Sequence, residues 1–218
     1  MVRRTKEDAE MTRNRLLDAA EQVFHAKGVS GASLSEVAQA ASMTRGAIYW
    51  HFKDKADLFD AMLKRVTLPF EQAWEGDDGE GLQGPALPRI LSVYRMILHS
   101  VSAHAGVQRV FDIALYKVEC VGEMLAVRER RLMGLMRFTK QVEAALSLAA
   151  KQQDVQLTIP TGSAAIGLHA IFDGVLHAWL LHNARPFDLE KEGMTAVTCY
   201  LQALGLNVSK EIAQISQN

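Results

Sequence analysis

The sequence predicts an all-α fold with two parts, an N-terminal three-helix helix-turn-helix domain and a larger all-helical C-terminal domain. Apolar residues recur three and four positions apart along most of the 218 residues, which is the spacing of amphipathic helices. Alternating runs of β-branched and aromatic residues between turn signals, which would indicate strands, are missing. Near the start, short segments with capping residues surround a tight polar break, and this arrangement predicts small helices packed together.

The first predicted helix ends near Gly28, a residue that readily takes the left-handed conformation that follows many helices. Its apolar face is formed by Leu16, Leu17, Ala20, Val23 and Phe24. A second helix should begin at Ser33, because the Ser33 hydroxyl can accept from an early amide while Glu36 reaches back. Its apolar residues, again on one face, are Leu34, Val37, Ala38 and Ala41.

A polar break at Ser42 leads into a third predicted helix over about residues 44–52. Asp54 then has the character of an N-cap for a fourth helix, whose inner face carries Leu58, Phe59, Met62 and Val66. A tight break between two short helices is typical of the helix-turn-helix.

The fourth helix should continue to about Trp74, and a linker rich in glycine and acids follows over residues 75–88. Further helices are expected near 87–104, 107–117, 119–150, 162–183 and 189–204. We therefore divide the chain into a helix-turn-helix domain of residues 1–54 and an all-helical domain of residues 55–218.

Composition favours a protein of the cytoplasm. The net charge of −1 and the two cysteines, which lack a CxxC spacing, indicate free thiols in a reducing compartment. Basic residues near the start precede no apolar stretch, so they do not resemble a secretory signal. The apolar run 164–181 is long enough to span a bilayer, but it contains His169, Asp173 and His177, which makes insertion costly. We expect a helix buried in protein and no membrane partner.

The third predicted helix, TRGAIYWHF, has two different sides. Ile48 and Phe52 lie one turn apart and can face the core, which leaves a cation, small residues and amphipathic aromatics outside. Such a surface suits a DNA groove, because small residues allow close approach and Arg45 can donate to guanine acceptors. Tyr49 and His51 can donate to phosphate oxygens.

At this point the sequence resembles the TetR family of bacterial repressors, most closely over residues of about 12–58. The segment SLSEVAQAASMTRGAIYWHFKDKADLF is similar to the DNA-binding signature of that family, and the N-terminal RRTKEDAEMTR is similar to its drug-efflux branch, AcrR and relatives. The resemblance implies a ligand-responsive repressor of an efflux operon, bound to a palindromic double-stranded DNA operator. It places at the DNA Ser33, Thr44, Arg45, Gly46, Ala47, Tyr49, Trp50, His51 and Lys55.

Alternatives stay open within that set. Gly46 can be small for packing alone, and Trp50 can support the helix rather than touch DNA. Tyr49, His51 and Lys55 can also belong to an ordinary solvated face. Arg3, Arg4 and Lys6 fit either a basic arm along the DNA or a disordered tail.

For the C-terminal half, the resemblance implies a homodimer whose last two long helices pair with their twins as a four-helix bundle. A small hydrophobic effector needs a cavity lined by apolar groups with a few polar ones. Candidate lining residues are Phe70, Trp74, Tyr94, Met96, Phe111, Leu115, Phe138, Phe172 and Asp173. Plain core packing is the alternative for the apolar ones. Asp173 can meet a ligand or pair with His177 one turn later.

The sequence has three rival interpretations. An enzyme or metal centre is disfavoured, because the histidines have no ligand spacing and no phosphate loop or nucleophile elbow occurs; we expect no catalytic residue, no metal and no cofactor. A regulator of lipid or other metabolism would keep the DNA binding and sense a metabolite instead of drugs. An interaction protein without sequence specificity would bind operator and random DNA equally.

Overall fold

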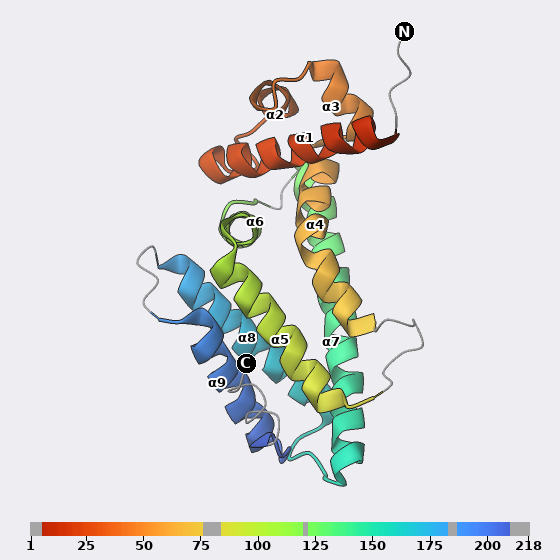
Figure 1. Ribbon diagram of the computed structural model, residues 1–218, viewed down its shortest axis with the longest axis vertical. Helices are drawn as coiled ribbons and strands as arrows, with labels where there is room; N and C mark the ends of the chain where they lie inside the picture. The colour runs from red at the N-terminus through yellow and green to blue at the C-terminus, as the bar shows by residue number, and fades with distance from the viewer. Residues whose placement is uncertain (1–5, 76–83, 120–121, 183–186, 210–218) are drawn as a thin grey trace. The chain divides into compact units, whose positions relative to one another are not determined.

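The computed structural model describes residues 6–75, 84–119, 122–182 and 187–209. Arg3, Arg4, Cys120 and most of the expected linker, residues 76–83, lie outside these ranges. Within them the chain forms nine α-helices and one short 3-10 helix, without a strand, so the predicted all-α fold is confirmed. Figure 1 labels the helices in chain order.

The helices are, in order, α1 Lys6–Lys27, α2 Leu34–Ala40, α3 Arg45–His51, α4 Lys55–Glu75, α5 Ala86–Ala103, α6 Ala105–Tyr116, η1 Gly122–Met124, α7 Leu125–Gln153, α8 Thr161–Leu181 and α9 Leu189–Ala203. Most bounds agree with the sequence within one or two residues. The long helix expected from 119 starts instead at Leu125, after the 3-10 turn η1 in which Gly122 has a φ of 54°. A residue in the left-handed region interrupts the helical hydrogen bonds, so α7 begins after it.

The chain divides into two compact units, each of which draws on two stretches of sequence. The first comprises Met1–Leu68 and Ala105–Arg131, and the second comprises Pro69–His104 and Leu132–Asn218. The first unit is larger than the helix-turn-helix domain expected over residues 1–54, since the start of α4 and all of α6 belong to it.

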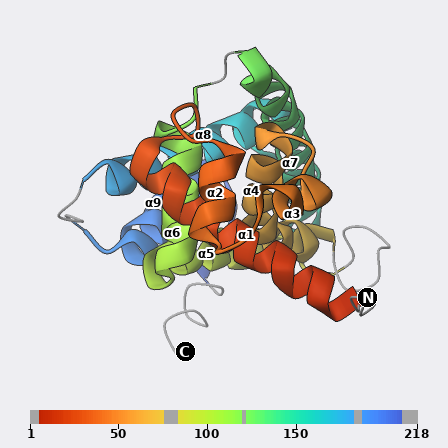
Figure 2. The same cartoon turned by 90° about the horizontal axis from the view of Figure 1, so that it is seen from above.

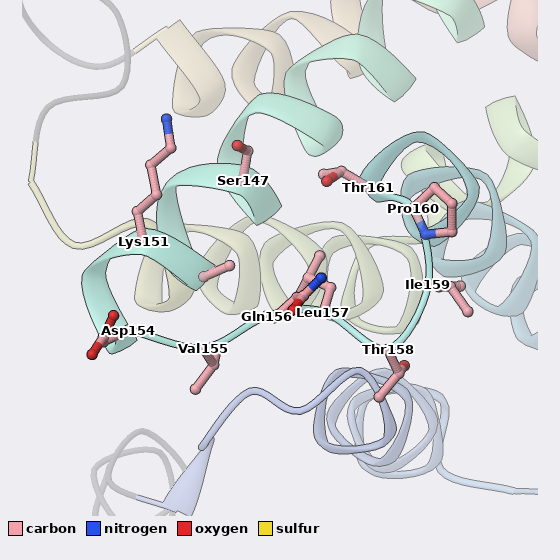
Figure 3. Close-up of a pocket in the computed structure, with 11 residues that line it drawn as sticks. Ser147, Lys151, Asp154, Val155, Gln156, Leu157, Thr158, Ile159, Pro160 and Thr161 are labelled. Carbon is pink, nitrogen blue, oxygen red and sulfur yellow. The ribbon is translucent and has the colours of Figure 1, made fainter.

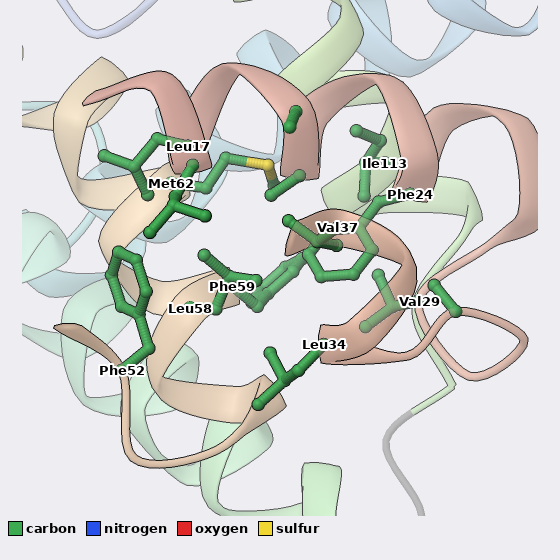
Figure 4. Packing of buried hydrophobic residues seen from close by; sticks show 14 of the residues in the cluster. Leu17, Phe24, Val29, Leu34, Val37, Phe52, Leu58, Phe59, Met62 and Ile113 are labelled. Atoms are coloured by element: carbon green, nitrogen blue, oxygen red, sulfur yellow. The ribbon is translucent and has the colours of Figure 1, made fainter. Parts of the chain in front are cut away.

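A single apolar core holds the first unit together (Figure 4). Phe24 of α1, Val37 of α2 and Phe59 of α4 are each fully buried in it, and Ile113 of α6 closes it. Helix α2 packs against both α1 and α3, and the three helices lie together in both views of the chain (Figures 1 and 2). Gly28, at a φ of 74°, ends α1 as predicted, and the amide of Val29 then donates to the carbonyl of Lys117 at 2.8 Å.

In the second unit, α9 packs against both α5 and α8. Two glycines permit this close approach. A side chain at Gly167 of α8 would collide with the Tyr200 hydroxyl of α9, and a Cβ at Gly193 would come within 2.7 Å of Leu98 of α5. The Tyr200 hydroxyl donates to the carbonyl of Ala164 at 3.2 Å, so the same approach satisfies a polar group.

Helix α8 has more apolar surface than one chain covers. It is long and apolar enough to pass a test for a membrane span, yet only 33% of its most apolar window is buried. Ile166 and Leu181 are 63% and 69% exposed. The prediction of a helix buried in protein is therefore met on one face only, and the other face remains open in a single chain.

Candidate functional site

Helix α3 separates its side chains into an inner and an outer set, as the sequence predicted. Ile48 is fully buried and Phe52, the residue after the helix, is 1% exposed, and both lie in the core of the first unit. Trp50 is 72% exposed and Tyr49 is 48% exposed. With two anchors on one side, the short helix can hold its other side outward.

The outer surface of α3 carries the predicted residues. Thr44, Arg45 and Gly46 are exposed, and Ala47 and His51 are half-buried. A Cβ built at Gly46 would meet only the Thr44 hydroxyl, at 4.0 Å, so packing within the chain does not require glycine there. The Arg45 guanidinium lies over the Tyr49 ring at 5.6 Å, and the Trp50 and His51 rings meet edge to face at 4.6 Å. The surface combines a cation, aromatic edges and room for close approach.

Contacts at both ends of α3 fix its position. The Thr44 hydroxyl caps the helix by accepting from the amide of Ala47 at 3.3 Å. In the preceding turn Ser42 takes a left-handed φ of 56°, and Arg15 of α1 donates to the carbonyl of Ala41 at 3.0 Å. The Arg13 guanidinium lies over the Phe52 ring at 5.2 Å. Sequence reasoning missed Arg13 and Arg15, since no local pattern links α1 to a turn about 26 residues later.

The predicted capping box at Ser33 is present at the start of α2. The amide of Glu36 donates to the Ser33 hydroxyl at 3.2 Å, and the Ser33 amide donates to the Glu36 carboxylate at 2.9 Å. Lys27, at the end of α1, donates to the same carboxylate. Hydrogen bonds from Lys27 and then Ser33 lower the pKa of Glu36 to about 2. Ser33 thus fixes α2 as well as being exposed on the surface.

Lys55 is placed by backbone carbonyls at the start of α4. Its ammonium donates to the carbonyls of Ser30 and Ala32 at 3.2 and 3.1 Å, so it ties the loop before α2 to α4. Asp54 caps α4 as predicted, accepting from the amide of Asp57 at 2.8 Å. The structure therefore gives Lys55 a structural role that its position in the motif does not reveal.

Ion pairs join α1 and α4 to other helices of the same unit. Glu21 is 7% exposed, and its carboxylate accepts from Arg109 of α6 at 2.6 Å with Arg65 of α4 at 3.8 Å. Asp60 of α4 pairs with Arg130 of α7, although burial outweighs that partner and raises the pKa of Asp60. Helix α6 is thereby tied to the helix-turn-helix by a buried charge pair.

In the second unit, four of the predicted ligand-lining aromatics form one cluster around Phe138 of α7. The ring centroid of Phe138 lies 5.5 Å from Trp74 of α4 and 6.0 Å from Tyr94 of α5. Phe172 of α8 meets Tyr94 at 4.8 Å, and His169, one turn earlier, meets Phe138 at 5.6 Å. The sequence did not assign His169 to this site, although its spacing from Phe172 puts both on one helix face.

Three polar atoms in this aromatic cluster are buried without a hydrogen-bond partner among the described residues, namely Trp74 Nε1, the Tyr94 hydroxyl and His169 Nδ1. Burial lowers the pKa of His169, against a weaker opposing effect of Asp173, and burial also raises the pKa of Tyr94. Both groups are therefore held in their neutral forms at neutral pH. Buried donors and acceptors without partners are uncommon in folded proteins.

The other predicted lining residues lie apart from the cluster. Met96 is 39% exposed, and two residues along α5 from Tyr94 it occupies another face of the helix. Phe111 and Leu115 are half-buried on α6, in the first compact unit. Phe70 is buried near the start of the second unit without a ring contact to the cluster. Asp173 lies 3.5 Å from His177, which is the pairing considered as the alternative to a ligand.

A separate open groove of about 790 Å³ lies at the end of α7 and along the loop to α8 (Figure 3). Its lining includes Lys151, Asp154 and Thr158, and none of the predicted ligand residues. Because the three polar atoms described above lie elsewhere, this groove is not our candidate for the ligand site.

Comparison with known proteins covers both units. The model for bacterial regulatory proteins of the tetR family matches residues 16–62, and the model for the C-terminal region of MAATS-type transcriptional repressors matches residues 87–206. The HTH-type transcriptional regulator AcrR of Shigella flexneri is 33% identical over 213 residues, covering 93% of each chain.

Solved structures agree. NalD, the secondary repressor of the MexAB-OprM multidrug efflux pump in Pseudomonas aeruginosa, superposes with a TM-score of 0.78 at 32% identity, over 91% of this chain and 98% of that one. A SmeT–triclosan complex gives a TM-score of 0.77 at 31% identity, over 88% and 91%; SmeT is the repressor of a Stenotrophomonas maltophilia efflux pump. The resemblance seen in the sequence is confirmed, and the chain belongs to the TetR family of bacterial transcriptional regulators.

Proposed function

We propose that this protein is a cytoplasmic, homodimeric repressor of a multidrug efflux operon, released from its operator by a small hydrophobic ligand. The observation that carries this proposal is the likeness to named efflux repressors along nearly the whole chain, which includes the second compact unit as well as the helix-turn-helix. A general DNA-binding module would share only the first unit with such proteins.

In this proposal α3 is the recognition helix in the major groove. Arg45 donates to guanine acceptors, and Thr44, Gly46 and Ala47 allow the backbone to approach the base edges. Tyr49, Trp50 and His51 contact the sugar-phosphate backbone, while Ser33 and Lys55 offer contacts at the starts of α2 and α4. Support comes from the exposure of this surface and from the free space around Gly46.

Dimerisation would cover the open face of α8. Ile166, Gly174 and Leu181 share that face, and a Cβ at Gly174 would meet no atom within 4 Å. The exposed outer face of α9, with Thr195 and Cys199, supplies the second helix of each protomer. Burial of this apolar surface favours association, and a twofold dimer can place two recognition helices about 34–36 Å apart, one turn of DNA.

The ligand would bind at the aromatic cluster in the second unit. It would favour one of two arrangements of the dimer, with a different separation of the recognition helices in each. We place Trp74, Tyr94, Phe138 and Phe172 at the ligand and propose a structural pairing with His177 for Asp173.

Binding to DNA from the protein's own upstream region tests the function. We expect affinity for one palindrome well above that for random DNA of equal length, falling as salt rises. Arg45→Ala should weaken operator binding by about 10- to 100-fold, as expected for a bidentate base contact. Arg137→Ala, which removes an exposed arginine from α7, is the matched control. Equal affinity for palindrome and random DNA would exclude a sequence-specific repressor.

The efflux assignment has its own test. Hydrophobic antimicrobials, added to the complex of the protein with its operator, should release the protein from the DNA. Release only by acyl thioesters or other metabolites would instead favour a metabolic regulator.

A further inference from the structure

The turn between α2 and α3 contains a residue in a conformation that L side chains rarely adopt. Ser42 has a φ of 56°, in the left-handed region, and it follows Ala41, the C-cap of α2. The amide of Ser42 donates to the carbonyl of Gln39 at 2.9 Å, and the amide of Met43 donates to the carbonyl of Ala38 at 2.8 Å. These two bonds form the Schellman motif, in which the left-handed position is usually occupied by glycine.

The side chain of Ser42 makes this turn less stable than a turn with glycine at the same position. In the left-handed region a Cβ comes too close to the following carbonyl oxygen, whereas glycine has no Cβ and adopts the region freely. The strain favours a rotation of the backbone at Ser42 that would open the turn. Because α3 begins at Arg45, three residues later, this rotation would change the direction in which α3 leaves the turn.

Arg15 of α1 holds the peptide group that precedes Ser42. Its guanidinium donates from Nη2 to the carbonyl oxygen of Ala41 at 3.0 Å. This carbonyl belongs to the peptide bond between Ala41 and Ser42, and its orientation depends on the φ angle of Ser42. A terminal helix carbonyl has no partner within its own helix, and a charged donor gives it a strong hydrogen bond. The bond from Arg15 therefore opposes the rotation that would open the turn.

A second arginine of α1 reaches the other end of α3. The Arg13 guanidinium lies over the ring of Phe52, 5.2 Å from its centroid, and Phe52 directly follows α3. Phe52 is itself anchored in the core of the first unit. Two arginines of α1 thus contact the residues on both sides of a helix that is only seven residues long.

We propose that Arg15 is a positioning residue for the recognition helix: it holds the strained turn at Ser42 and so fixes the direction of α3 on the operator, without touching the DNA. The inference rests on the proposed repressor function and concerns how that function discriminates between sequences. Base contacts require side chains in register with the base edges, whereas phosphate contacts form with any sequence. A loosened α3 would therefore lose affinity for the operator and keep its affinity for random DNA.

A direct contact with a DNA phosphate is the competing interpretation of Arg15. The residue is exposed on α1, and arginine is a common partner of phosphates in protein–DNA complexes. A phosphate contact contributes to the binding of every sequence and releases a counterion. Its loss lowers all affinities and reduces the dependence of binding on salt. The two interpretations thus predict different results with random DNA and with salt.

Fluorescence anisotropy of the full-length protein with its operator palindrome, and with a random duplex of equal length, tests the proposal. Arg15→Met removes the donor and keeps an unbranched side chain. We expect it to weaken operator binding by about five- to tenfold, the effect of one lost hydrogen bond. Binding to random DNA should change by less than about twofold, with an unchanged slope of log affinity against log salt.

Arg128→Met is the matched control, because it removes an exposed arginine from α7 in the same compact unit. It should leave the ratio of the two affinities unchanged. An equal loss on both duplexes in Arg15→Met, or a salt slope smaller by about one, would overturn the proposal in favour of a phosphate contact.

Ser42→Gly separates positioning from a general loss of structure. Glycine adopts the left-handed region without strain, so the turn no longer needs the bond from Arg15. We expect Ser42→Gly to restore the operator affinity of Arg15→Met to within about twofold of the parent protein. A double variant that binds the operator no more tightly than Arg15→Met would overturn the proposal, because the strain at Ser42 would then have no part in the effect.

Arg15→Lys gives a second comparison if Arg15→Met does not melt cooperatively. Lysine keeps the charge for a phosphate, but its side chain ends one atom earlier and lacks the planar guanidinium. Positioning predicts a loss of about threefold on the operator alone. A phosphate contact predicts no loss on either duplex, and that result would overturn the proposal.

The parent protein in the same experiment tests the proposed function separately. If it binds the palindrome and the random duplex equally, the repressor function is refuted. If it discriminates between them and Arg15→Met discriminates equally well, the repressor function stands and the role of Arg15 is refuted.

Discussion

The outer surface of α3 and the aromatic cluster of the second unit contain similar side chains in opposite settings. On α3, Tyr49 and Trp50 are exposed to solvent, and the buried residue of the helix, Ile48, is apolar. In the cluster, Trp74 and Tyr94 hold theirs in the interior without partners. A surface that meets a large charged partner can remain solvated until it binds, whereas a site for a small apolar molecule has to keep water out beforehand. Exposed side chains on α3 can hydrogen-bond to water, whereas the buried polar atoms of the cluster have lost their hydrogen bonds to water on folding.

The largest effect should come from the buried side of α3. Ile48→Ala removes a fully buried side chain from the core of the first unit and should lower the free energy of unfolding by about 2–4 kcal/mol. Trp50→Ala, two residues later on the exposed side, should change it by less than about 0.5 kcal/mol while weakening operator binding. Urea denaturation of the two variants measures this contrast, and a large loss of stability for Trp50→Ala would show that its ring supports the fold.

A somewhat smaller loss is expected at the ion pair between α1 and α6. Glu21→Gln leaves Arg109 and Arg65 without their buried carboxylate and should lower the free energy of unfolding by about 2 kcal/mol, discounted because Arg109 is partly exposed. Asp18→Asn, which removes a mostly exposed partner of the same Arg65, is the control and should have little effect. Similar losses in both variants would mean that the buried carboxylate of Glu21 stabilises the fold no more than the exposed carboxylate of Asp18.

In the aromatic cluster a substitution should act in the opposite direction. Tyr94→Phe removes a buried hydroxyl that has no partner among the described residues, so we expect the free energy of unfolding of the ligand-free protein to rise by about 1 kcal/mol. Thermal melts of the parent protein and the variant measure this difference. A loss of stability would show that the Tyr94 hydroxyl has a hydrogen-bond partner. The cluster would then not differ from α3 in leaving polar atoms without partners.

The smallest effect should be the pH dependence of the cap on α2. Because the pKa of Glu36 is lowered from 4.5 to about 2, its carboxylate contributes stability that is fully present above about pH 4.5 and is lost as the pH falls through about 2. The urea midpoints of the parent protein and Glu36→Gln should therefore converge as the solution is acidified across this window. If the two midpoints instead differed by a constant amount over this pH range, the charge of Glu36 would contribute nothing and the cap would act through neutral hydrogen bonds alone.

The features that the sequence predicted depend on neighbours within about four residues. The capping box at Ser33, the inward pair Ile48 and Phe52, and the cap at Asp54 are all local, and all are confirmed. Pro69 lies inside α4, yet the helix continues to Glu75 as expected, because packing of an amphipathic helix outweighs one missing amide.

What the sequence could not provide are contacts between distant segments. The carbonyl partners of Lys55 and the pairing of Glu21 with Arg109, which are 88 residues apart, follow from how helices pack. The same holds for His169, whose place beside Phe138 no local pattern predicted, and for Met96, which lies on a different face of α5 from Tyr94. Residue type and spacing predict what a side chain can do, and tertiary packing decides whether it is in position to do it.

The shortness of α3 has a further consequence. Seven residues make two turns, too few for an isolated helix to persist in water. The helix is therefore stabilised by the packing of Ile48 and Phe52 and by the Thr44 cap, which fix its backbone in the absence of a partner. Association through this helix then needs no coupled folding, so little conformational entropy is lost at that step and more of the contact energy remains as affinity.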